Sequence, residues 1–431
     1  MYRLAPMLLC VAALAARAQE LDKLGLPSWM KVGAEFRGRF EGTNAIDFKP
    51  GSGDHFYLHR IRLDLQFRPA PGLAFVFQPQ HTEAPGYRPP VAANVEDHFD
   101  FHQAFAEYVH GAKDAPQYGI RVGRQEVNFG AQRLIGSSNW GNTSRANDAI
   151  RLFREDASTR VDLFASTVVQ TQQYKLDRFK PDIQLQGLHV QWKKLLPGGL
   201  LETYTFRKIA KRENGEALAG QPAVAGRTDI YTPGLRAIGK LPRRFDYNLE
   251  TAVQAGRVGT STHSAWAGYW EFGYRVAKSA GAPRILAGYT HASGDGNPRD
   301  GHSDTFDQLY PTNHAFYGWA DRMSWRNVHE AIFGVDIHPL KKMVMNIQYH
   351  SFWLATRQDA FYNFNGRAVV RNPNATSSHV QQELDVNTAW DLYKHLQVIV
   401  GLTNVFPGAF LRESTPGTHT FIPYLQWRYA F

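Results

Sequence analysis

Cysteine and long apolar runs are nearly missing from this chain of 431 residues. The single cysteine, Cys10, lies in the N-terminal apolar segment, so the rest of the chain has no disulfide, thiol or thiolate-metal chemistry. After that segment no stretch of roughly 18 or more apolar residues occurs, which excludes an α-helical membrane protein. The mean hydropathy of −0.40 still allows a membrane barrel, because a barrel needs an apolar residue only at every second position.

Motifs for catalysis and cofactor binding are also lacking. The chain has no Gly-x-Ser-x-Gly, no convincing Ser/His/acid order, no P-loop and no dinucleotide fingerprint. His329-Glu330 lacks the second histidine of a zinc metallopeptidase helix and falls in a strand pattern. We therefore predict neither an enzyme nor a cofactor. A carboxylate pair for polysaccharide cleavage is the catalytic alternative that the scattered acidic residues leave open.

Potential metal ligands are present, but their spacing is poor. The pairs His55/His59 and His98/His102 are four residues apart, which aligns ligands on a helix but not on a strand or loop. We interpret these histidines as rim residues without a ligand role. The segment 295–301 offers oxygen ligands, yet its spacing misses the EF-hand register by one residue. A solvated turn is therefore favoured over a calcium site, and we predict no metal.

The N-terminus has the features of a secretory signal peptide. Arg3 precedes the apolar stretch, and Ala16-Arg17-Ala18 forms a small-residue cleavage site. Loss of Arg3 and Arg17 with the signal lowers the formal net charge from +9 to +7. Export argues against nucleic acid as a partner, whereas the mild positive charge suits an anionic surface or solute. We predict a signal peptide over 1–18, a short leader over 19–30 and a single domain over 31–431.

Strict alternation of apolar and polar residues dominates the chain from Val32 onward. In segments such as 61–67 and 331–337, every second residue is apolar, and many of the opposite positions are charged. Burying such charges in the core of a soluble sandwich would be prohibitively costly, whereas a water-filled lumen accepts them. We expect 18 strands near 31–41, 55–68, 72–81, 100–110, 117–127, 146–155, 159–170, 182–194, 198–208, 230–240, 246–257, 263–277, 283–293, 327–338, 341–355, 379–392, 395–405 and 421–431.

The connections between these strands alternate in length. Even-numbered strands are followed by short turns, and most odd-numbered strands by long polar loops, as in outer-membrane barrels with periplasmic turns and extracellular loops. The chain also ends in an aromatic strand at Phe431, which resembles the recognition signal of barrels inserted into bacterial outer membranes. We predict an all-β fold, a single transmembrane antiparallel barrel of about 18 strands in the bacterial outer membrane. A secreted sandwich or propeller would lack the loop asymmetry.

Two stretches carry a specific resemblance to a known family. The first comprises Gly123-Arg124-Gln125-Glu126-Val127-Asn128-Phe129-Gly130, Arg133-Leu134-Ile135-Gly136, Trp140, Asn142, Arg145 and Asp148-Ala149-Ile150-Arg151. The second comprises Ser293-Gly294-Asp295-Gly296-Asn297-Pro298, Thr305-Phe306-Asp307-Gln308-Leu309-Tyr310-Pro311-Thr312-Asn313-His314, Tyr317-Gly318 and Asp321. Together they resemble the alginate export family of outer-membrane barrels, over most of the mature chain. The resemblance implies passive export of an anionic polysaccharide through an arginine-rich pore.

Arginine suits such a solute, because guanidinium stays charged and pairs carboxylates bidentately. Arg124, Asp148 and Arg151 match positions of the family motif. Strict alternation places Arg124 on the face opposite Arg121 and Gln125, so the strand must end or bulge near Gly123 if Arg124 is to enter the lumen. Our candidate pore-lining residues are Arg37, Arg39, Arg60, Arg62, Arg124, Arg133, Arg145, Asp148 and Arg151.

The lumen face also carries acids, including Glu250, Glu383 and Asp385, so alginate itself is not fixed as the solute. A general or sugar-uptake porin is the first alternative, and a structural barrel with a plugged lumen is another. The long loops 128–145 and 294–326 are candidates for inward-folded constrictions. The predicted partners are an anionic saccharide or other anionic solute, outer-membrane lipid and periplasmic export machinery.

Overall fold

The computed structural model describes residues 25–88, 90–112, 114–179, 181–211, 226–279 and 281–431. The predicted signal peptide, 1–18, and residues 19–24 of the predicted leader lie outside the described residues. No helix in the described part of the chain is long and apolar enough to cross a membrane.

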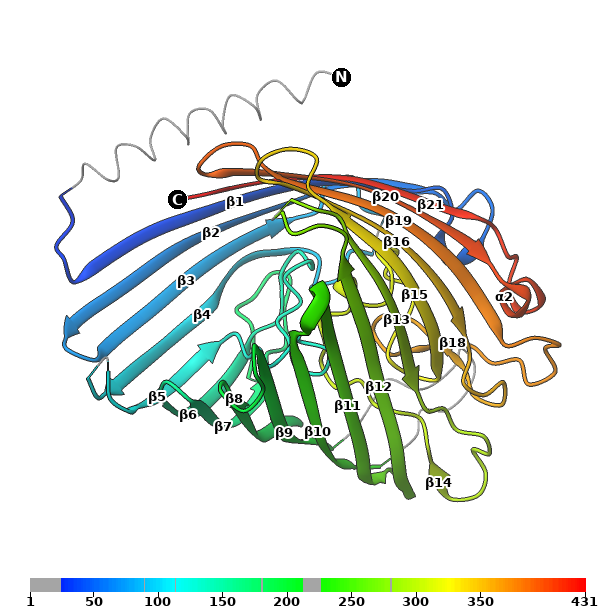
Figure 1. Cartoon of the computed structure of the whole chain (residues 1–431), viewed down its shortest axis with the longest axis horizontal. Helices are drawn as coiled ribbons and strands as arrows, with labels where there is room; N and C mark the ends of the chain where they lie inside the picture. Colours follow the sequence, from blue (N-terminus) through cyan, green and yellow to red (C-terminus); the bar gives the residue numbers. More distant parts are fainter. Residues whose placement is uncertain (1–24, 89, 113, 180, 212–225, 280) are drawn as a thin grey trace.

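Eighteen long antiparallel strands form one closed barrel (Figure 1). Each strand pairs with its neighbours along the chain, and the first and last strands, β1 and β21, pair with each other to close the ring. The barrel strands are β1 (Met30–Thr43), β2 (Asp54–Ala70), β3 (Leu73–Glu83), β4 (Asp97–His110), β5 (Gln117–Gln125), β6 (Asn147–Glu155), β7 (Thr159–Val168), β8 (Ile183–Trp192), β9 (Gly199–Ala210), β10 (Thr228–Lys240), β11 (Phe245–Val258), β12 (Ser261–Arg275), β13 (Arg284–Ala292), β15 (Val328–Ile337), β16 (Met343–Trp353), β19 (His379–Asp391), β20 (Leu396–Pro407) and β21 (Thr420–Ala430). The predicted all-β barrel of about 18 strands is confirmed.

Small elements lie in the long loops, and sequence periodicity did not predict them. A two-residue strand pairs in parallel with β12, and a short hairpin lies between β16 and β19. These additions and the short helices are β14 (His302–Ser303), β17 (Phe361–Tyr362), β18 (Ala368–Val370), η1 (Ile46–Phe48), η2 (Pro242–Arg244), η3 (Asn313–Ala315) and α2 (Ala409–Ser414). Each is too short to give a periodic signal of its own.

Side chains along the barrel strands point alternately into the lumen and to the outer face. On β2, Arg60 and Arg62 are 3% and 5% exposed and point inward, whereas Ile61 and Leu63 are 43% and 38% exposed on the outer face. Successive side chains on a strand point to opposite faces, so the same short segment supplies both a lipid-facing and a lumen-facing surface.

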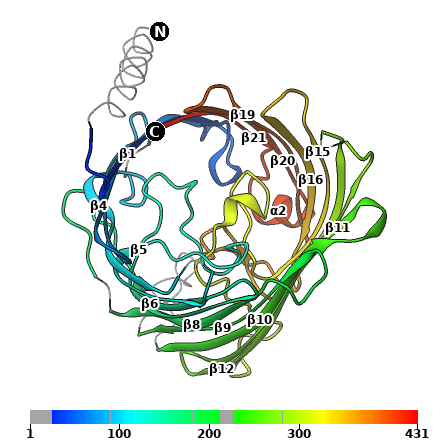
Figure 2. The same cartoon turned by 60° about the vertical axis from the view of Figure 1, so that its left-hand side comes forward.

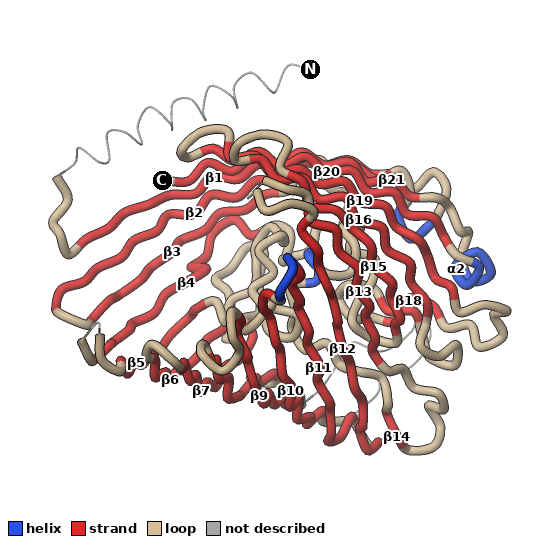
Figure 3. The backbone as a smooth tube through the Cα atoms, in the orientation of Figure 1, coloured by secondary structure: helices blue, strands red, loops and turns tan. Residues whose placement is uncertain are grey.

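Much of two long loops folds into the lumen (Figures 2 and 3), whereas the segment that contains β14 projects at the loop end (Figure 1). They are loop 126–146, between β5 and β6, and loop 293–327, between β13 and β15. Their apolar side chains, such as Phe129 and Trp325, join inward wall residues in one buried cluster. Small wall residues such as Ala265 and Ala267 leave space for this packing. The barrel therefore has a core inside its lumen, and the solute pathway is what this core leaves open.

Candidate functional site

Wall arginines hold loop 126–146 in the lumen. Arg37 donates to the carbonyl oxygen of Asn139 at 2.6 Å, and Arg62 donates to the Asn139 side-chain oxygen at 3.2 Å. Arg60 and Arg62 both donate to Ser144 Oγ at 3.0 Å. Guanidinium presents five donors in a rigid fork, which suits several oxygen acceptors on one loop. These predicted pore arginines are therefore also the attachment points of the loop.

Trp140, at the tip of this loop, meets loop 293–327 in the middle of the lumen. Its indole stacks on the His314 ring, with centroids 3.7 Å apart and planes 6° apart. Arg39 covers the same indole, with its guanidinium carbon 3.7 Å from the ring centroid, and donates to the Trp140 carbonyl at 2.7 Å. His314 Nδ1 lies 2.9 Å from Asp321 Oδ2, and this contact fixes the orientation of the imidazole ring. The stack is therefore held from both sides.

The two loops also bond through their backbones. Ile135 and Tyr310 form a parallel bridge, and the Tyr310 carbonyl accepts the Gly136 N–H at 2.9 Å. Arg145 joins them from the side, donating to the carbonyls of Gly136 at 2.7 Å and Tyr310 at 2.8 Å. Burial lowers the pKa of Arg145 to about 10, so it remains a cation at neutral pH. The loops thus form one partition across the lumen.

Two buried ion pairs fasten this partition to the opposite wall. Arg133 Nε lies 3.4 Å from Glu250 Oε2 on β11, and the Arg133 guanidinium carbon lies 3.5 Å from the Tyr269 ring centroid. Lys208 on β9 pairs with Asp307 at 2.7 Å. Burial alone would raise the pKa of Asp307, but mainly the Lys208 ammonium lowers it to about 2. Both pairs link a loop residue to a wall residue.

One side of the partition is a cavity of about 700 Å³, which we call the turn-end cavity because it lies toward the short turns. Its charged side chains are four arginines and three carboxylates, a formal charge of +1. They are Arg37, Arg60, Arg62, Arg428, Glu35, Asp64 and Glu126. Arg428 is the most exposed of these arginines, with 47% of its side chain accessible beside Glu35.

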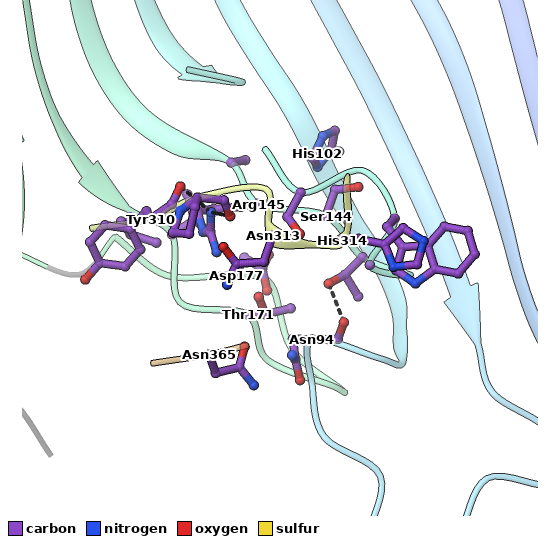
Figure 4. A pocket seen from close by; sticks show the side chains of 18 of the residues that line it. Asn94, His102, Ser144, Arg145, Thr171, Asp177, Tyr310, Asn313, His314 and Asn365 are labelled. Atoms are coloured by element: carbon purple, nitrogen blue, oxygen red, sulfur yellow. Dashed lines mark hydrogen bonds between the residues drawn. The ribbon is translucent and has the colours of Figure 1, made fainter. Parts of the chain in front are cut away.

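The other side is a cavity of about 380 Å³ toward the long loops, the loop-end cavity (Figure 4). Its lining includes Arg145 and three carboxylates, Asp100, Asp177 and Asp321, a formal charge of −2 with every group ionised. Burial, and next the nearby Asp100 carboxylate, raise the pKa of Asp177 to about 7. The two cavities therefore carry opposite charge.

Among the residues that the structure describes, only Trp140 and His314 line both cavities. The stacked rings therefore lie where the two cavities adjoin. The sequence motifs contained both residues, but a stack between loops so distant in sequence leaves no local signal.

Arg124 and Asp148 lie elsewhere than expected. β5 pairs with β4 and β6 in an unbroken register through Gly123, so Arg124 shares the face of Val122 and Ile150. Those two side chains are 44% and 52% exposed on the outer surface. Arg124 and Asp148 pair there at 3.0 Å, at the loop end of the wall, and Arg124 also pairs at 2.8 Å with Asp100, which lines the loop-end cavity. The Gly123 bulge that would turn Arg124 inward is not formed.

Arg151 points inward, in a separate cavity of about 280 Å³. It pairs with Asp162 at 2.7 Å, and its guanidinium carbon lies 5.2 Å from the Phe129 ring centroid. Of the nine predicted pathway residues, Arg37, Arg60 and Arg62 line the turn-end cavity and Arg145 the loop-end cavity. Arg428, Asp177 and His314 were not predicted as pathway residues.

The oxygen-rich segment 295–301 folds as a turn stabilised by its own side chains. Asp295 accepts the Asn297 N–H at 2.9 Å, Asn297 accepts the Arg299 N–H at 3.4 Å and Asp300 accepts the His302 N–H at 2.9 Å. One side-chain oxygen of each of these three residues thus accepts a backbone N–H within the segment.

The barrel resembles several solved outer-membrane structures. It matches OccAB2 of Acinetobacter baumannii with a TM-score of 0.62 and 8% identity, covering 94% of this chain and 99% of that one. It matches OpdO of Pseudomonas aeruginosa with a TM-score of 0.61 and 13% identity, covering 93% and 97%. It matches OccK2 (OpdF) of Pseudomonas aeruginosa, in complex with glucuronate, with a TM-score of 0.61 and 9% identity, covering 93% of this chain and 98% of that one. At these identities the likeness shows the fold alone.

No curated protein matches the chain. The model of the alginate export family, however, matches residues 28–424, which include almost the entire barrel. This match confirms the resemblance carried by the two sequence motifs. The chain therefore belongs to the alginate export family and forms a β-barrel of the bacterial outer membrane.

Proposed function

We propose that this outer-membrane channel passes anionic saccharides, and that the turn-end cavity is where the solute carboxylate binds. Family membership and barrel fold indicate a channel rather than an enzyme. The observation that carries the proposal is the group of four arginines in a cavity of about 700 Å³. With the short turns periplasmic, this cavity faces the periplasm.

The chemistry of uronates suits this group. A uronate carries one carboxylate per sugar, and guanidinium binds carboxylates through two parallel hydrogen bonds. Arg428 is the exposed member and lies where a solute entering from the turn end meets it first. One similar barrel, OccK2, is in complex with glucuronate, which supports an acidic sugar as the ligand class here as well.

The partition bears on the length of the solute. The Trp140–His314 stack separates the cavities, so a continuous polymer needs this pair to open, whereas an acidic sugar or short oligomer fits one cavity at a time. We propose export of an anionic polysaccharide as the function of an opened state. Passage of small acidic sugars is the second candidate, and the separated cavities favour it. Contact with periplasmic export machinery stays a prediction.

Planar-bilayer recording of the refolded protein tests the proposal. Under a salt gradient we expect a reversal potential of the anion-selective sign, and mono- and oligo-uronates added on the turn-end side should block the current. Arg62→Gln together with Arg428→Gln reduces the side-chain charge of the turn-end cavity from +1 to −1 and should weaken uronate block roughly tenfold.

Arg207→Gln is the matched control, because Arg207 pairs with Asp229 on the outer face near the loop end. It should leave block unchanged. Block by oligomers but not by the single sugar would favour polymer export over small-sugar passage. A cation-selective pore that uronates do not block would overturn the proposal.

A further inference from the structure

Three imidazoles surround one carboxylate on the outer face of the barrel, away from the lumen. In the β2–β3 register His59 lies opposite Glu83, and Ile61 lies opposite His81. Because i and i+2 on a strand share a face, His81 and Glu83 point to the same side as His59. The spacing of these residues along the chain does not reveal the group, because His59 comes from one strand and His81 and Glu83 from the next. His98 on β4 completes it.

The distances are those of a metal-ligand set. His59 Nε2 lies 3.5 Å from Glu83 Oε2, and His81 Nε2 lies 3.4 Å from Glu83 Oε1. One donor atom from each of the three residues lies within 4.8 Å of the others. Two ligands at about 2.0–2.1 Å from a tetrahedral zinc ion are about 3.4 Å apart, so the side chains need little movement to close on an ion.

The hydrogen bonding of His81 sets its tautomer. Its Nδ1 contacts the carbonyl oxygen of His98, so Nδ1 carries a proton and donates it. In the neutral ring the Nε2 lone pair then points at the Glu83 carboxylate, and two acceptors facing each other repel. A cation between them removes the repulsion. Carbonyl-bound Nδ1 is also the usual arrangement behind a metal-ligating histidine.

Protonating the imidazoles instead gives a poorer balance of charge. His98 Nδ1 lies 3.7 Å from the same Glu83 Oε1 and its Nε2 lies 3.3 Å from Glu96 Oε1, so three cationic rings would face two carboxylates. The His59 and His81 centroids are 5.7 Å apart, and those of His81 and His98 are 5.9 Å apart. A single divalent ion neutralises Glu83 without that repulsion, because neutral imidazole is itself a ligand.

We propose that His59, His81 and Glu83 form a site for a divalent metal ion of the zinc class, with His98 or water as the fourth ligand. Imidazole nitrogen with a carboxylate selects zinc and its neighbours over calcium, which prefers oxygen ligands. The ion would tie β2 to β3 at the loop end of the wall and, through His98, β4 as well. It would act on the outer face, independent of the solute pathway.

Calorimetric titration of the untagged, refolded chain with zinc chloride tests the site. We expect one saturable equivalent per chain, and His81→Ala and Glu83→Gln should each weaken binding at least about tenfold. Cobalt titration should give the intense visible absorption of a tetrahedral ion, and both variants should lose it. His55→Ala is the matched control, since His55 is an exposed histidine on the same strand.

Circular dichroism of each variant verifies that the barrel has folded before its binding is compared. Zinc bound as tightly by His81→Ala and Glu83→Gln as by the unsubstituted chain would assign the metal to other residues and overturn the proposal. So would the lack of a saturable site, or a site that binds calcium and not zinc.

Discussion

Loops 126–146 and 293–327 line both the turn-end cavity and the loop-end cavity, but the two cavities differ in charge. The turn-end cavity has four arginines against three carboxylates, and the loop-end cavity has one arginine against three carboxylates. Trp140 and His314 line both cavities. The turn-end cavity takes its arginines from β1, β2 and β21, whereas the loop-end cavity takes Asp100 from β4 and Asp177 from the segment between β7 and β8.

This difference teaches that the net charge of the chain does not describe its pathway. A formal charge of +9 for the whole chain gives no sign of this contrast, yet on the pathway that we propose an anion would meet a basic compartment and an acidic one in series. Attraction in the basic compartment would raise the local anion concentration, and the acidic compartment would favour release. Weak, successive interactions of this kind allow a solute both to enter and to leave.

The two cavities stay separate only while the partition formed by the two loops stays in place. Removing Arg133, which attaches this partition to the wall, should therefore have the largest effect. Arg133→Ala removes both the ion pair with Glu250 and the contact with the Tyr269 ring, which costs about 3–5 kcal/mol of unfolding free energy. Guanidinium unfolding of the refolded barrel, followed by tryptophan fluorescence, measures the loss. Arg133→Met with Glu250→Gln removes both charges and should recover most of it. A single variant as stable as the unsubstituted chain would contradict the anchoring role.

Removing the boundary itself should merge the compartments. Trp140→Ala with His314→Ala deletes both stacked rings, and we expect single-channel conductance to rise roughly two- to fivefold because the two adjoining cavities then open into each other. Trp29→Ala is the control, since it removes an exposed tryptophan that lines neither cavity. Equal conductance in the double variant and the unsubstituted chain would mean that the solute takes another route.

The wall was predictable because its signal is local. Alternation along β2, such as Arg60, Ile61 and Arg62, needs only neighbouring residues, and the strand count followed from it together with turn length. Strand ends shifted by a few residues where pairing, not pattern, decides them. The outward position of Arg124 also follows from alternation, and only the family motif suggested an inward one.

The partition was predictable only in outline. Loops 128–145 and 294–326 stood out by length, but the bond from Arg145 to Tyr310 joins residues 165 positions apart. The Trp140–His314 stack and the raised pKa of Asp177 arise from such contacts, which single-sequence periodicity does not encode. Alternation predicted that Arg37, Arg39, Arg60 and Arg62 face the lumen, and these residues are buried on β1 and β2, whereas their hydrogen bonds to loop residues could not be predicted from the pattern.

The smallest expected effect is a change of anion selectivity with pH, which tests the charge assigned to the loop-end cavity. With a pKa of about 7, Asp177 is mostly ionised at pH 8 and mostly protonated at pH 6, so acidification moves the loop-end cavity from −2 toward −1. The anion-to-cation permeability ratio should therefore rise as pH falls, by less than about twofold because the remaining charges are screened. Reversal potentials at the two pH values measure the ratio, and Asp177→Asn should hold it near the acidic value throughout. If the variant keeps the full pH response, another group titrates, and the acidic half of the comparison loses its assigned residue.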